Sequence, residues 1–220
     1  MRQNAPSCSA WRLYVILDSA AANDRSLWEI AEGAIRGGAD VLQLRHKMGT
    51  ARELIEEARR LLPLTRSHGV PLIINDMADV AQWVDADGVH LGQDDLPVAA
   101  ARRLLGPGKL IGKSTHTLEQ ALAADTEEID YLGLGPIFAT PTKPDYGSVG
   151  LALIPRVQSR LQHPCVCIGG IDQQSLDQVL EAGAERVAVV RAVCAADHPE
   201  SATRALKQQL VQFSRTHLRS

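Results

Sequence analysis

Residues 27–47, LWEIAEGAIRGGADVLQLRHK, contain the structural unit that decides the fold. Apolar residues recur with helical spacing over residues 27–35, and the glycine-rich residues 37–40 then give a turn signal. The short apolar run 41–47 follows, and its length is typical of a buried strand. A helix that ends at glycines and leads into such a strand predicts a parallel sheet, provided that the unit recurs along the chain.

The unit does recur. Eight short apolar runs are predicted strands, at residues 13–18, 41–47, 71–76, 88–92, 110–114, 131–136, 165–170 and 187–192. Each precedes a stretch with helical spacing, at residues 27–35, 51–64, 78–84, 98–105, 118–124, 151–161, 176–182 and 201–213. Eight alternating units in 220 residues predict an α/β protein with a closed (β/α)8 TIM barrel. A doubly wound eight-stranded sheet is the alternative, and eight such even repeats fit it less naturally.

Composition and charge narrow the classes of function. The chain is 45% hydrophobic and 22% charged, which is ordinary for a globular protein and excludes disorder, collagen and coiled coil. A net charge of −3 argues against a broad nucleic-acid surface, although a local cationic pocket for a small anion fits it. No apolar run approaches about 18 residues, and the first residues lack an apolar signal core. We therefore expect a cytoplasmic protein that binds small molecules, with no nucleic-acid or membrane partner; nothing in the sequence indicates its oligomeric state.

The chain is expected to form one domain. No low-complexity linker divides it, so residues 13–220 are assigned to the barrel and residues 1–12 to a loose or capping N-terminal tail. The longest connection, residues 137–150, follows the sixth predicted strand and is rich in Thr, Pro, Lys and Gly. Long loops inside compact domains are usually functional.

The four cysteines carry no metal or disulfide signature. Cys8, Cys165, Cys167 and Cys194 lack the spacing of zinc ligands or of a disulfide framework. Free cysteines of this kind usually behave as small core side chains, and we expect that role here.

The second predicted strand ends in a cationic cluster. Its alternation places Gln43, Arg45 and Lys47 on one face and Leu44 and His46 on the other. Active sites of TIM barrels lie at the carboxyl ends of the strands. Two cations and an amide at such an end suit a phosphate or diphosphate better than a plain solvated surface.

Carboxylates follow the next two predicted strands. The third ends at Asn75 and Asp76, and the fourth is followed by Asp94 and Asp95. Mg²⁺ in proteins commonly takes one or two carboxylates together with substrate phosphates and water. Asp76 and Asp95 are therefore candidate Mg²⁺ ligands beside the cationic cluster, whereas Asp94 is expected to cap the following helix.

The remaining strand ends offer hydroxyls, an imidazole and glycines. After the fifth predicted strand, Ser114 and His116 could orient a substrate, or Ser114 could be a helix cap and His116 a structural histidine. The long loop places Thr140, Thr142 and Lys143 close together. At the end of the seventh strand, glycines such as Gly170 let backbone N–H groups approach an anion, but they also serve in ordinary turns.

Taken together, these motifs resemble the thiamine-phosphate synthase family, also called thiamine-phosphate pyrophosphorylase. The matching segments are QLRHK at 43–47, ND at 75–76, GVHLGQDD at 88–95, GLGP at 133–136 with TPTK at 140–143, and GGI at 169–171. They occur in order on separate predicted strands, and the resemblance runs from Leu13 onward.

The resemblance implies a reaction and a site. The family is a TIM barrel that joins 4-amino-5-hydroxymethyl-2-methylpyrimidine diphosphate to a thiazole phosphate, with or without a carboxylate, and releases diphosphate with Mg²⁺. Carried over to this sequence, it implies that the pyrimidine diphosphate site is formed by Gln43, Leu44, Arg45, His46, Lys47, Asn75, Ser114 and Lys143. It implies that the thiazole phosphate site is formed by Thr140, Pro141, Thr142, Gly170, Val190 and Arg191, and that Asp76 and Asp95 bind Mg²⁺.

Two residues depart from the family pattern. His46 stands where the family usually has Glu, but its side chain is expected to point away from the cluster. Arg191 stands where the family usually has Ser, which alters how the second phosphate is held.

Two other functions fit part of the pattern. A related thiazole tautomerase has the same fold, and His116 could supply the acid/base chemistry that it needs. That family resembles the synthase less in the metal-site aspartates and in the Thr-x-Thr-Lys loop, both of which this chain has. A non-catalytic barrel that binds thiamine precursors is the alternative from another class.

Overall fold

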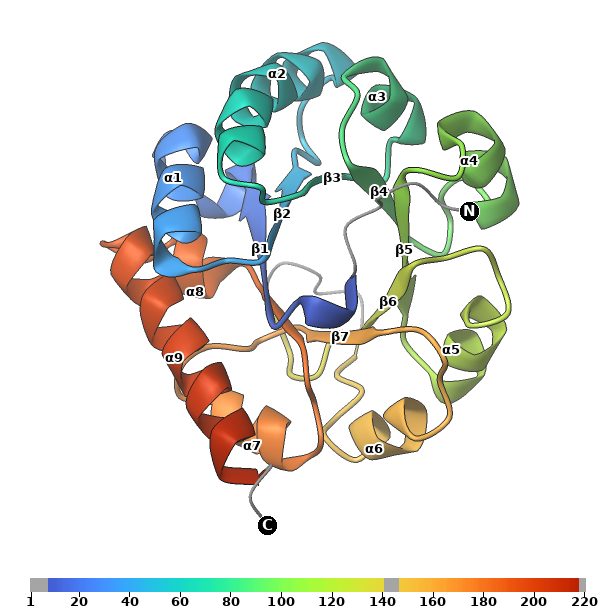
Figure 1. Cartoon of the computed structure of the whole chain (residues 1–220), viewed down its shortest axis with the longest axis vertical. Coiled ribbons are helices and arrows are strands. Elements are labelled where there is room, and N and C mark those ends of the chain that lie inside the picture. The colour runs from blue at the N-terminus through green and yellow to red at the C-terminus, as the bar shows by residue number, and fades with distance from the viewer. Residues whose placement is uncertain (1–7, 141–146, 218–220) are drawn as a thin grey trace.

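The computed structural model describes residues 8–140 and 147–217, and it shows a closed parallel barrel surrounded by helices (Figure 1). The strands are β1 (Leu13–Asp18), β2 (Val41–Arg45), β3 (Leu72–Asn75), β4 (Gly88–Leu91), β5 (Leu110–Thr115), β6 (Tyr131–Leu134), β7 (Cys165–Ile168) and β8 (Val187–Val189). Each pairs with its neighbour in chain order, and β1 closes the barrel on β8 with Leu13 opposite Val187. The predicted TIM barrel is confirmed, and the doubly wound alternative is excluded.

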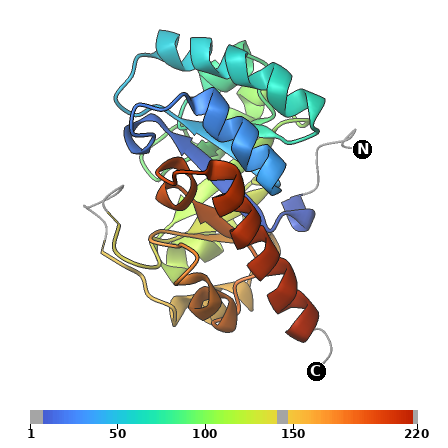
Figure 2. The ribbon, with the colours of Figure 1, turned by 90° about the vertical axis from the view of Figure 1, so that its left-hand side faces the viewer.

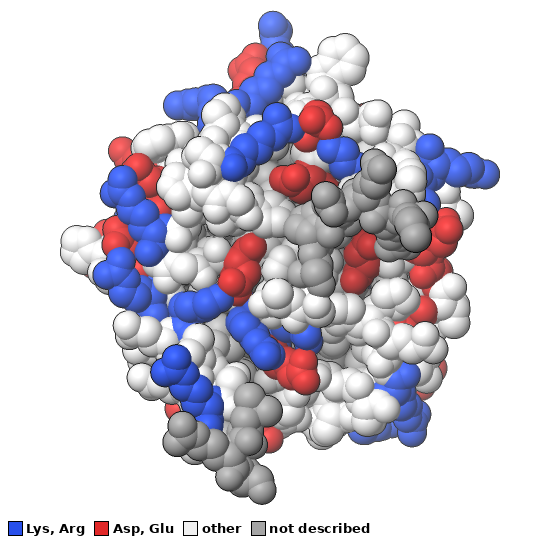
Figure 3. All heavy atoms as spheres, in the orientation of Figure 1, with Lys and Arg blue, Asp and Glu red and all other residues white. Residues whose placement is uncertain are grey.

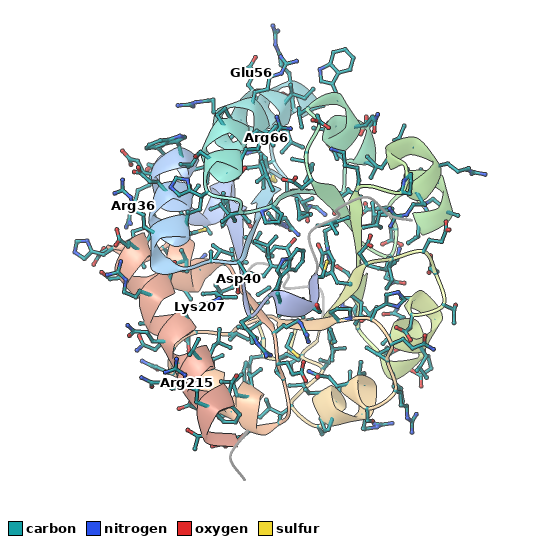
Figure 4. The ribbon with its side chains drawn as sticks, viewed as in Figure 1. Arg36, Asp40, Glu56, Arg66, Lys207 and Arg215 are labelled. Carbon is teal, nitrogen blue, oxygen red and sulfur yellow. The ribbon has the colours of Figure 1, made fainter. Side chains whose placement is uncertain are left out.

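The helices form the outer layer. They are α1 (Leu27–Gly37), α2 (Ala51–Ser67), α3 (Ala78–Trp83), α4 (Val98–Leu105), α5 (Leu118–Ala124), α6 (Leu153–Gln158), α7 (Leu176–Glu181), α8 (Arg191–Cys194) and α9 (Pro199–His217). The long helix α9 crosses the outside of the barrel beside α1 (Figure 2). Lys207 of α9 points toward Asp40 at the start of β2, at 2.5 Å (Figure 4), and Asp40 also accepts the backbone N–H groups of Arg12 and Leu13.

The apolar core has two parts. The larger part lies between the strands and the helices, where alternate strand residues such as Leu44 and Ile74 are fully buried. The smaller part fills the barrel interior, and it includes Tyr14, Tyr131 and Trp11. Trp11 follows a short 3₁₀ helix, Cys8–Ala10, that lies across the amino end of the barrel (Figure 1). The amino end is therefore closed, and the carboxyl end is left for a ligand.

Several element boundaries differ from the sequence prediction at the carboxyl ends of strands. The run 41–47 is a strand only to Arg45, because the polar residues that follow leave the sheet for the rim. The predicted strand 187–192 ends at Val189, and its last residues begin α8, a short helix that the sequence did not predict. Apolar residues in a first helical turn continue the pattern of the preceding strand, which explains the error.

The burial of the cysteines and the distribution of surface charge are as the composition predicts. All four cysteines are buried and free, which confirms the predicted core role. In residues 8–140 and 147–217 no helix is both long and apolar enough to cross a membrane. On the described part of the face in Figure 3, basic and acidic side chains are interspersed rather than separated into fields of one sign.

Candidate active site

A cavity of about 530 Å³ opens at the carboxyl end of the barrel. Strand ends and the loops that follow them supply its walls, as expected for this fold. Eight of the residues assigned from the sequence line it: Gln43, Arg45, Asn75, Ser114, Thr140, Gly170, Val190 and Arg191.

The side chains at the end of β2 point alternately to the two faces of the strand, as predicted. Gln43 and Arg45 line the cavity, whereas Leu44 is fully buried on the opposite face, in the core beneath the helices. His46 also points away from the cavity, with Nδ1 2.7 Å from the Ser19 hydroxyl and Nε2 3.8 Å from Glu53. Neither Leu44 nor His46 lines the cavity, so any role for them in binding is indirect.

Arg45 is held by a buried carboxylate that the sequence analysis missed. Its guanidinium donates to Asp18 Oδ2 at 2.5 Å, and Asp18 is only 1% exposed. Asp18 also accepts the backbone N–H of Ala20, which fixes its side chain. One N–H group of the guanidinium is therefore occupied, and because Arg45 lines the cavity, its other N–H groups can donate to an anion there.

Asp76 and Asp95 lie together beside Lys47, at a rim outside the set of residues that line the cavity; Asp76 directly follows Asn75, which lines it. Burial raises the pKa of Asp76, and the adjacent Asp95 carboxylate raises it further, while Lys47, 3.5 Å away, lowers it. Asp76 adopts a left-handed backbone conformation (φ 64°), which Asp and Asn tolerate better than most residues with a side chain. Asp95 accepts the backbone N–H of Gly92 at 2.6 Å, so its position is fixed by the loop.

The carboxylate pair fits Mg²⁺. Two hard oxygen ligands that repel each other gain from a divalent cation between them, and Mg²⁺ completes its octahedron with water and substrate phosphate. No group of three or more His, Cys, Asp or Glu side chains within the described residues could form a metal cage. Asp76 and Asp95 therefore suit a metal that arrives with a phosphorylated substrate.

Ser114 is not a helix cap, although the sequence left that role open. The cap of α5 is Thr117, whose hydroxyl accepts the N–H of Gln120. Ser114 instead lies at the cavity with its Oγ 2.9 Å from His90 Nε2. His116 also lines the cavity, and its Nδ1 lies 2.5 Å from the carbonyl oxygen of Gly135.

One expected cap is wrong. Asp94 does not cap α4, because the cap position is Pro97 and no side chain makes a capping bond there. The backbone after β4 is instead fixed by Asp95 and by Lys113, which donates to the carbonyl of Gly92 at 2.7 Å.

The opposite wall contains the two glycines that follow β7, Gly169 and Gly170, and also Asp172. Gly170 has a left-handed conformation (φ 64°), and a Cβ placed there would lie 2.7 Å from the Cβ of Phe138. This close approach holds the loop after β6 against the loop after β7, with Thr140 at the cavity. Pro141, Thr142 and Lys143 lie outside the described residues.

Val190 and Arg191 complete that wall at the start of α8. Val190 is the N-cap of the helix, and its carbonyl accepts the N–H groups of Val193 and Cys194. Arg191 is exposed and lines the cavity. The first turn of a helix presents N–H groups without intrahelical acceptors, which favour an anion.

Four residues of the site escaped the sequence analysis: Asp18, Tyr14, His90 and Tyr131. Tyr14, His90 and Tyr131 line the cavity and are joined by hydrogen bonds, as described below. The sequence signal that could have identified them is a polar residue at an inward-facing strand position, because a barrel interior is otherwise filled by branched apolar residues.

Known proteins of one family are similar to this chain over nearly its whole length. A family model described as thiamine monophosphate synthase matches residues 13–193. A thiamine-phosphate synthase of Chloroflexus aurantiacus is 52% identical over 198 residues, which cover 90% of this chain and 91% of that protein. One of Shouchella clausii is 44% identical over 205 residues, covering 93% of this chain and 98% of that protein. The structure of a thiamine phosphate pyrophosphorylase from Pyrococcus furiosus has a TM-score of 0.84 at 34% identity, covering 92% of this chain and 96% of that one.

The barrel, its cavity and these relatives define a TIM-barrel transferase. The chain belongs to the thiamine-phosphate synthase family and is a transferase of thiamine biosynthesis. The family resemblance stated from the sequence motifs is thereby confirmed.

Proposed function

We propose that this protein forms thiamine phosphate by Mg²⁺-assisted displacement of diphosphate from 4-amino-5-hydroxymethyl-2-methylpyrimidine diphosphate by a thiazole phosphate. Both substrates are small molecules, and the cytoplasm stays the location predicted from the sequence. The observation that carries the proposal is the rim cluster: Arg45 lines the cavity, and Lys47, Asp76 and Asp95 lie together next to Asn75, which also lines it.

The cationic side of the cavity serves the leaving group. Departure of diphosphate from the pyrimidine methylene carbon builds negative charge on the departing oxygens. Arg45, fixed by Asp18, donates to those oxygens without having to reorganise, and Lys47 adds a second positive charge at the rim. Lys143, assigned through the family resemblance, would contribute from the loop after β6.

The charges of the described site support the proposal that a divalent cation takes part. Among the described residues, Arg45, Lys47 and Arg191 carry three positive charges, and Asp18, Asp76, Asp95 and the cavity-lining Asp172 carry four negative charges, so the described site has no excess of positive charge. A diphosphate needs more positive charge than these side chains provide. Mg²⁺ held by Asp76 and Asp95 would share the charge of the leaving group as a Lewis acid.

The rest of the site positions the two substrates. Gln43, Asn75 and Ser114 face the cavity beside Arg45 and would hold the pyrimidine diphosphate, with Leu44 and His46 supporting β2 from behind. Thr140, Pro141 and Thr142, with Gly170, Val190 and Arg191, would hold the thiazole phosphate on the opposite wall. The thiazole nitrogen attacks through its lone pair and needs no general base, so catalysis consists of positioning and charge stabilisation.

The test is a reconstitution with purified protein, both substrates and Mg²⁺. We expect thiamine phosphate and diphosphate to form in equal amounts, and the rate to fall when Mg²⁺ is chelated and to recover when it is added back. Isomerisation of the thiazole without coupling would instead identify a tautomerase. Tight binding of both substrates without turnover would identify a non-catalytic binding protein.

A further inference from the structure

A chain of five polar side chains crosses the barrel interior beneath the cavity. Gln43 Nε2 lies 2.8 Å from Tyr14 Oη, which lies 3.0 Å from Tyr131 Oη. Tyr131 Oη lies 3.1 Å from His90 Nδ1, and His90 Nε2 lies 2.9 Å from Ser114 Oγ. All four contacts have hydrogen-bond lengths. The two end residues are assigned to the pyrimidine diphosphate, whereas the three between them have no assigned role.

Because these five side chains are largely buried, their polar groups need hydrogen-bond partners among themselves. Tyr131 is fully buried, and Gln43 and Tyr14 are 2% and 3% exposed. Trp11 covers the tyrosines from the amino end, with ring centroids 5.9 Å from Tyr14 and 5.3 Å from Tyr131. Burial raises the pKa of both tyrosines, so both hydroxyls keep their hydrogens. A buried hydroxyl without an acceptor is costly, and each of these hydrogens therefore needs one.

The order of donors along the chain follows from its first member. The Gln43 amide nitrogen donates to Tyr14, so Tyr14 donates to Tyr131, and Tyr131 donates to His90 Nδ1. An imidazole nitrogen that accepts a hydrogen bond carries no hydrogen, so His90 is neutral and has its hydrogen on Nε2. Nε2 then donates to Ser114 Oγ. With the amide in this orientation, only this order gives both tyrosine hydrogens an acceptor within the chain.

We propose that Tyr131 and His90 are positioning residues that make the Ser114 hydroxyl a hydrogen-bond donor toward the pyrimidine substrate. Because Ser114 Oγ accepts from His90, its own hydrogen is directed to an acceptor in the cavity, such as a ring nitrogen. The neutral imidazole also places no positive charge beside the pyrimidine ring, where positive charge develops as diphosphate departs. The inference rests on the assignment of Ser114 to the pyrimidine diphosphate.

The first test reads the tautomer directly and needs no substrate. In protein labelled with ¹⁵N-histidine, with the His90 signals assigned through a His90→Asn variant, we expect one protonated nitrogen, Nε2, and one unprotonated nitrogen, Nδ1. In Tyr131→Phe, we expect this preference to weaken, because the donor to Nδ1 is gone. A hydrogen on Nδ1 in the wild-type protein, or hydrogens on both nitrogens, would overturn the inference whether or not the proposed reaction is correct.

The second test separates positioning from packing. Tyr131→Phe should lower kcat/KM for the pyrimidine diphosphate about tenfold, the scale of one oriented hydrogen bond, and leave the KM of the thiazole phosphate unchanged. Tyr14→Phe should have a smaller effect, because Tyr131 can still donate to His90. Trp11→Phe is the matched control, since it alters the same ring cluster without touching the hydrogen-bond chain.

A double mutant completes the test. If Tyr131 acts through Ser114, then Tyr131→Phe should change kcat/KM less than twofold in a Ser114→Ala background. The full tenfold loss in that background would overturn the inference, and so would a loss in Trp11→Phe equal to that in Tyr131→Phe. Melting temperatures of all variants distinguish loss of folded protein from loss of rate.

Discussion

The two walls of the cavity are built from different chemical groups. On the side of β2 to β5, the groups that face a ligand are side chains fixed by other side chains, as Arg45 is by Asp18. On the side of β6 to β8, the groups proposed to hold the thiazole phosphate are backbone at Gly170 and Val190 and the exposed Arg191 side chain, and Asp172 also lines this wall. One wall therefore carries charges held in place, and the other carries N–H groups and close backbone contacts.

The difference matches the work that each wall is proposed to do. Charge changes on the diphosphate during the reaction, and preorganised charged side chains act on such a change. The phosphate of the thiazole takes no part in bond breaking, so it needs anchoring alone, which backbone N–H groups supply. Substitutions on the first wall should therefore lower kcat, and substitutions on the second should raise the KM of the thiazole phosphate.

The largest expected effect is that of Arg45→Ala. Removing a preorganised donor to a developing negative charge should lower kcat about 100- to 1000-fold, while the KM of the thiazole phosphate stays the same. Steady-state formation of thiamine phosphate at varied concentrations of both substrates measures the two quantities separately. Arg45→Lys should restore the activity only in part, because an ammonium lacks the planar fork that pairs with Asp18 and an anion together.

The matched control is Arg102→Ala. Arg102 forms a similarly buried ion pair with Asp130 at 2.6 Å, but it lies away from the cavity and binds backbone carbonyls of neighbouring loops. Its loss should destabilise the fold by about 3–5 kcal/mol without changing kcat per folded molecule. A fall in kcat in Arg102→Ala equal to that in Arg45→Ala would mean that the effect of Arg45 is structural.

The second-largest expected effect is on the Mg²⁺ concentration that the reaction needs. Asp76→Asn and Asp95→Asn should each raise the Mg²⁺ concentration for half-maximal rate about 10- to 100-fold, because each removes a charged oxygen ligand. Titration of the rate with Mg²⁺ measures this. The neighbouring, exposed Asp94→Asn is the control and should leave the Mg²⁺ dependence unchanged. Unchanged dependence in both Asp76→Asn and Asp95→Asn would remove the metal from this rim.

These side chains are the part of the site that the sequence could predict. Alternation in an eight-unit barrel decides that Gln43 and Arg45 face inward while Leu44 faces the helices. Chain order decides that the loops after β3 and β4 are neighbours, which brings Asp76 to Asp95. Both inferences need only the period of the strand and the order of strands.

Side-chain partners on other strands could not be predicted in the same way. The pairing of Arg45 with Asp18 depends on the register between β1 and β2, and the contact of Tyr14 with Tyr131 depends on two strands that are not neighbours. Local sequence sets neither of these. The backbone wall was also hard to predict, since Val190 continues the apolar run of β8 although it is the N-cap of α8, which begins at Arg191.

The third-largest expected effect is that of Gly170→Ala, on the wall of β6 to β8. Gly170→Ala places a methyl group 2.7 Å from Phe138 in a left-handed conformation, so the loop that carries Thr140 must shift. The strain should cost about 1–3 kcal/mol of stability, and the KM of the thiazole phosphate should rise with little change in kcat. Gly183→Ala is the control, because its φ of 101° is similarly strained but a Cβ there would meet no atom within 4 Å.

The two glycine variants separate strain from displacement. Both should lose stability in thermal unfolding, whereas only Gly170→Ala should weaken the thiazole phosphate. A normal KM in Gly170→Ala, with the expected loss of stability, would mean that this loop contact does not shape the phosphate site.

The smallest expected effect concerns Arg191, the basic side chain that lines the wall of β6 to β8 within the described residues. We predict that its guanidinium binds the thiazole phosphate where the family usually has a Ser hydroxyl, since Arg pairs with phosphate through two charge-assisted bonds. Arg191 is exposed, so solvent weakens the contact, and Arg191→Ser should raise the KM of the thiazole phosphate only a few-fold. The increase should grow at low salt and shrink at high salt, because screening acts on an exposed charge.

Arg191→Ser also decides how far the contrast between the two walls extends. If the KM rises and follows ionic strength, this protein holds the thiazole phosphate with a cationic side chain in addition to backbone N–H groups. If the KM stays the same in the folded variant at every salt concentration, the first turn of α8 holds the phosphate through its N–H groups alone. Arg191→Lys separates charge from geometry, because it keeps the positive charge and loses the paired N–H donors. A KM in Arg191→Lys equal to that of Arg191→Ser would assign the effect to the bidentate geometry, and a wild-type KM would assign it to charge.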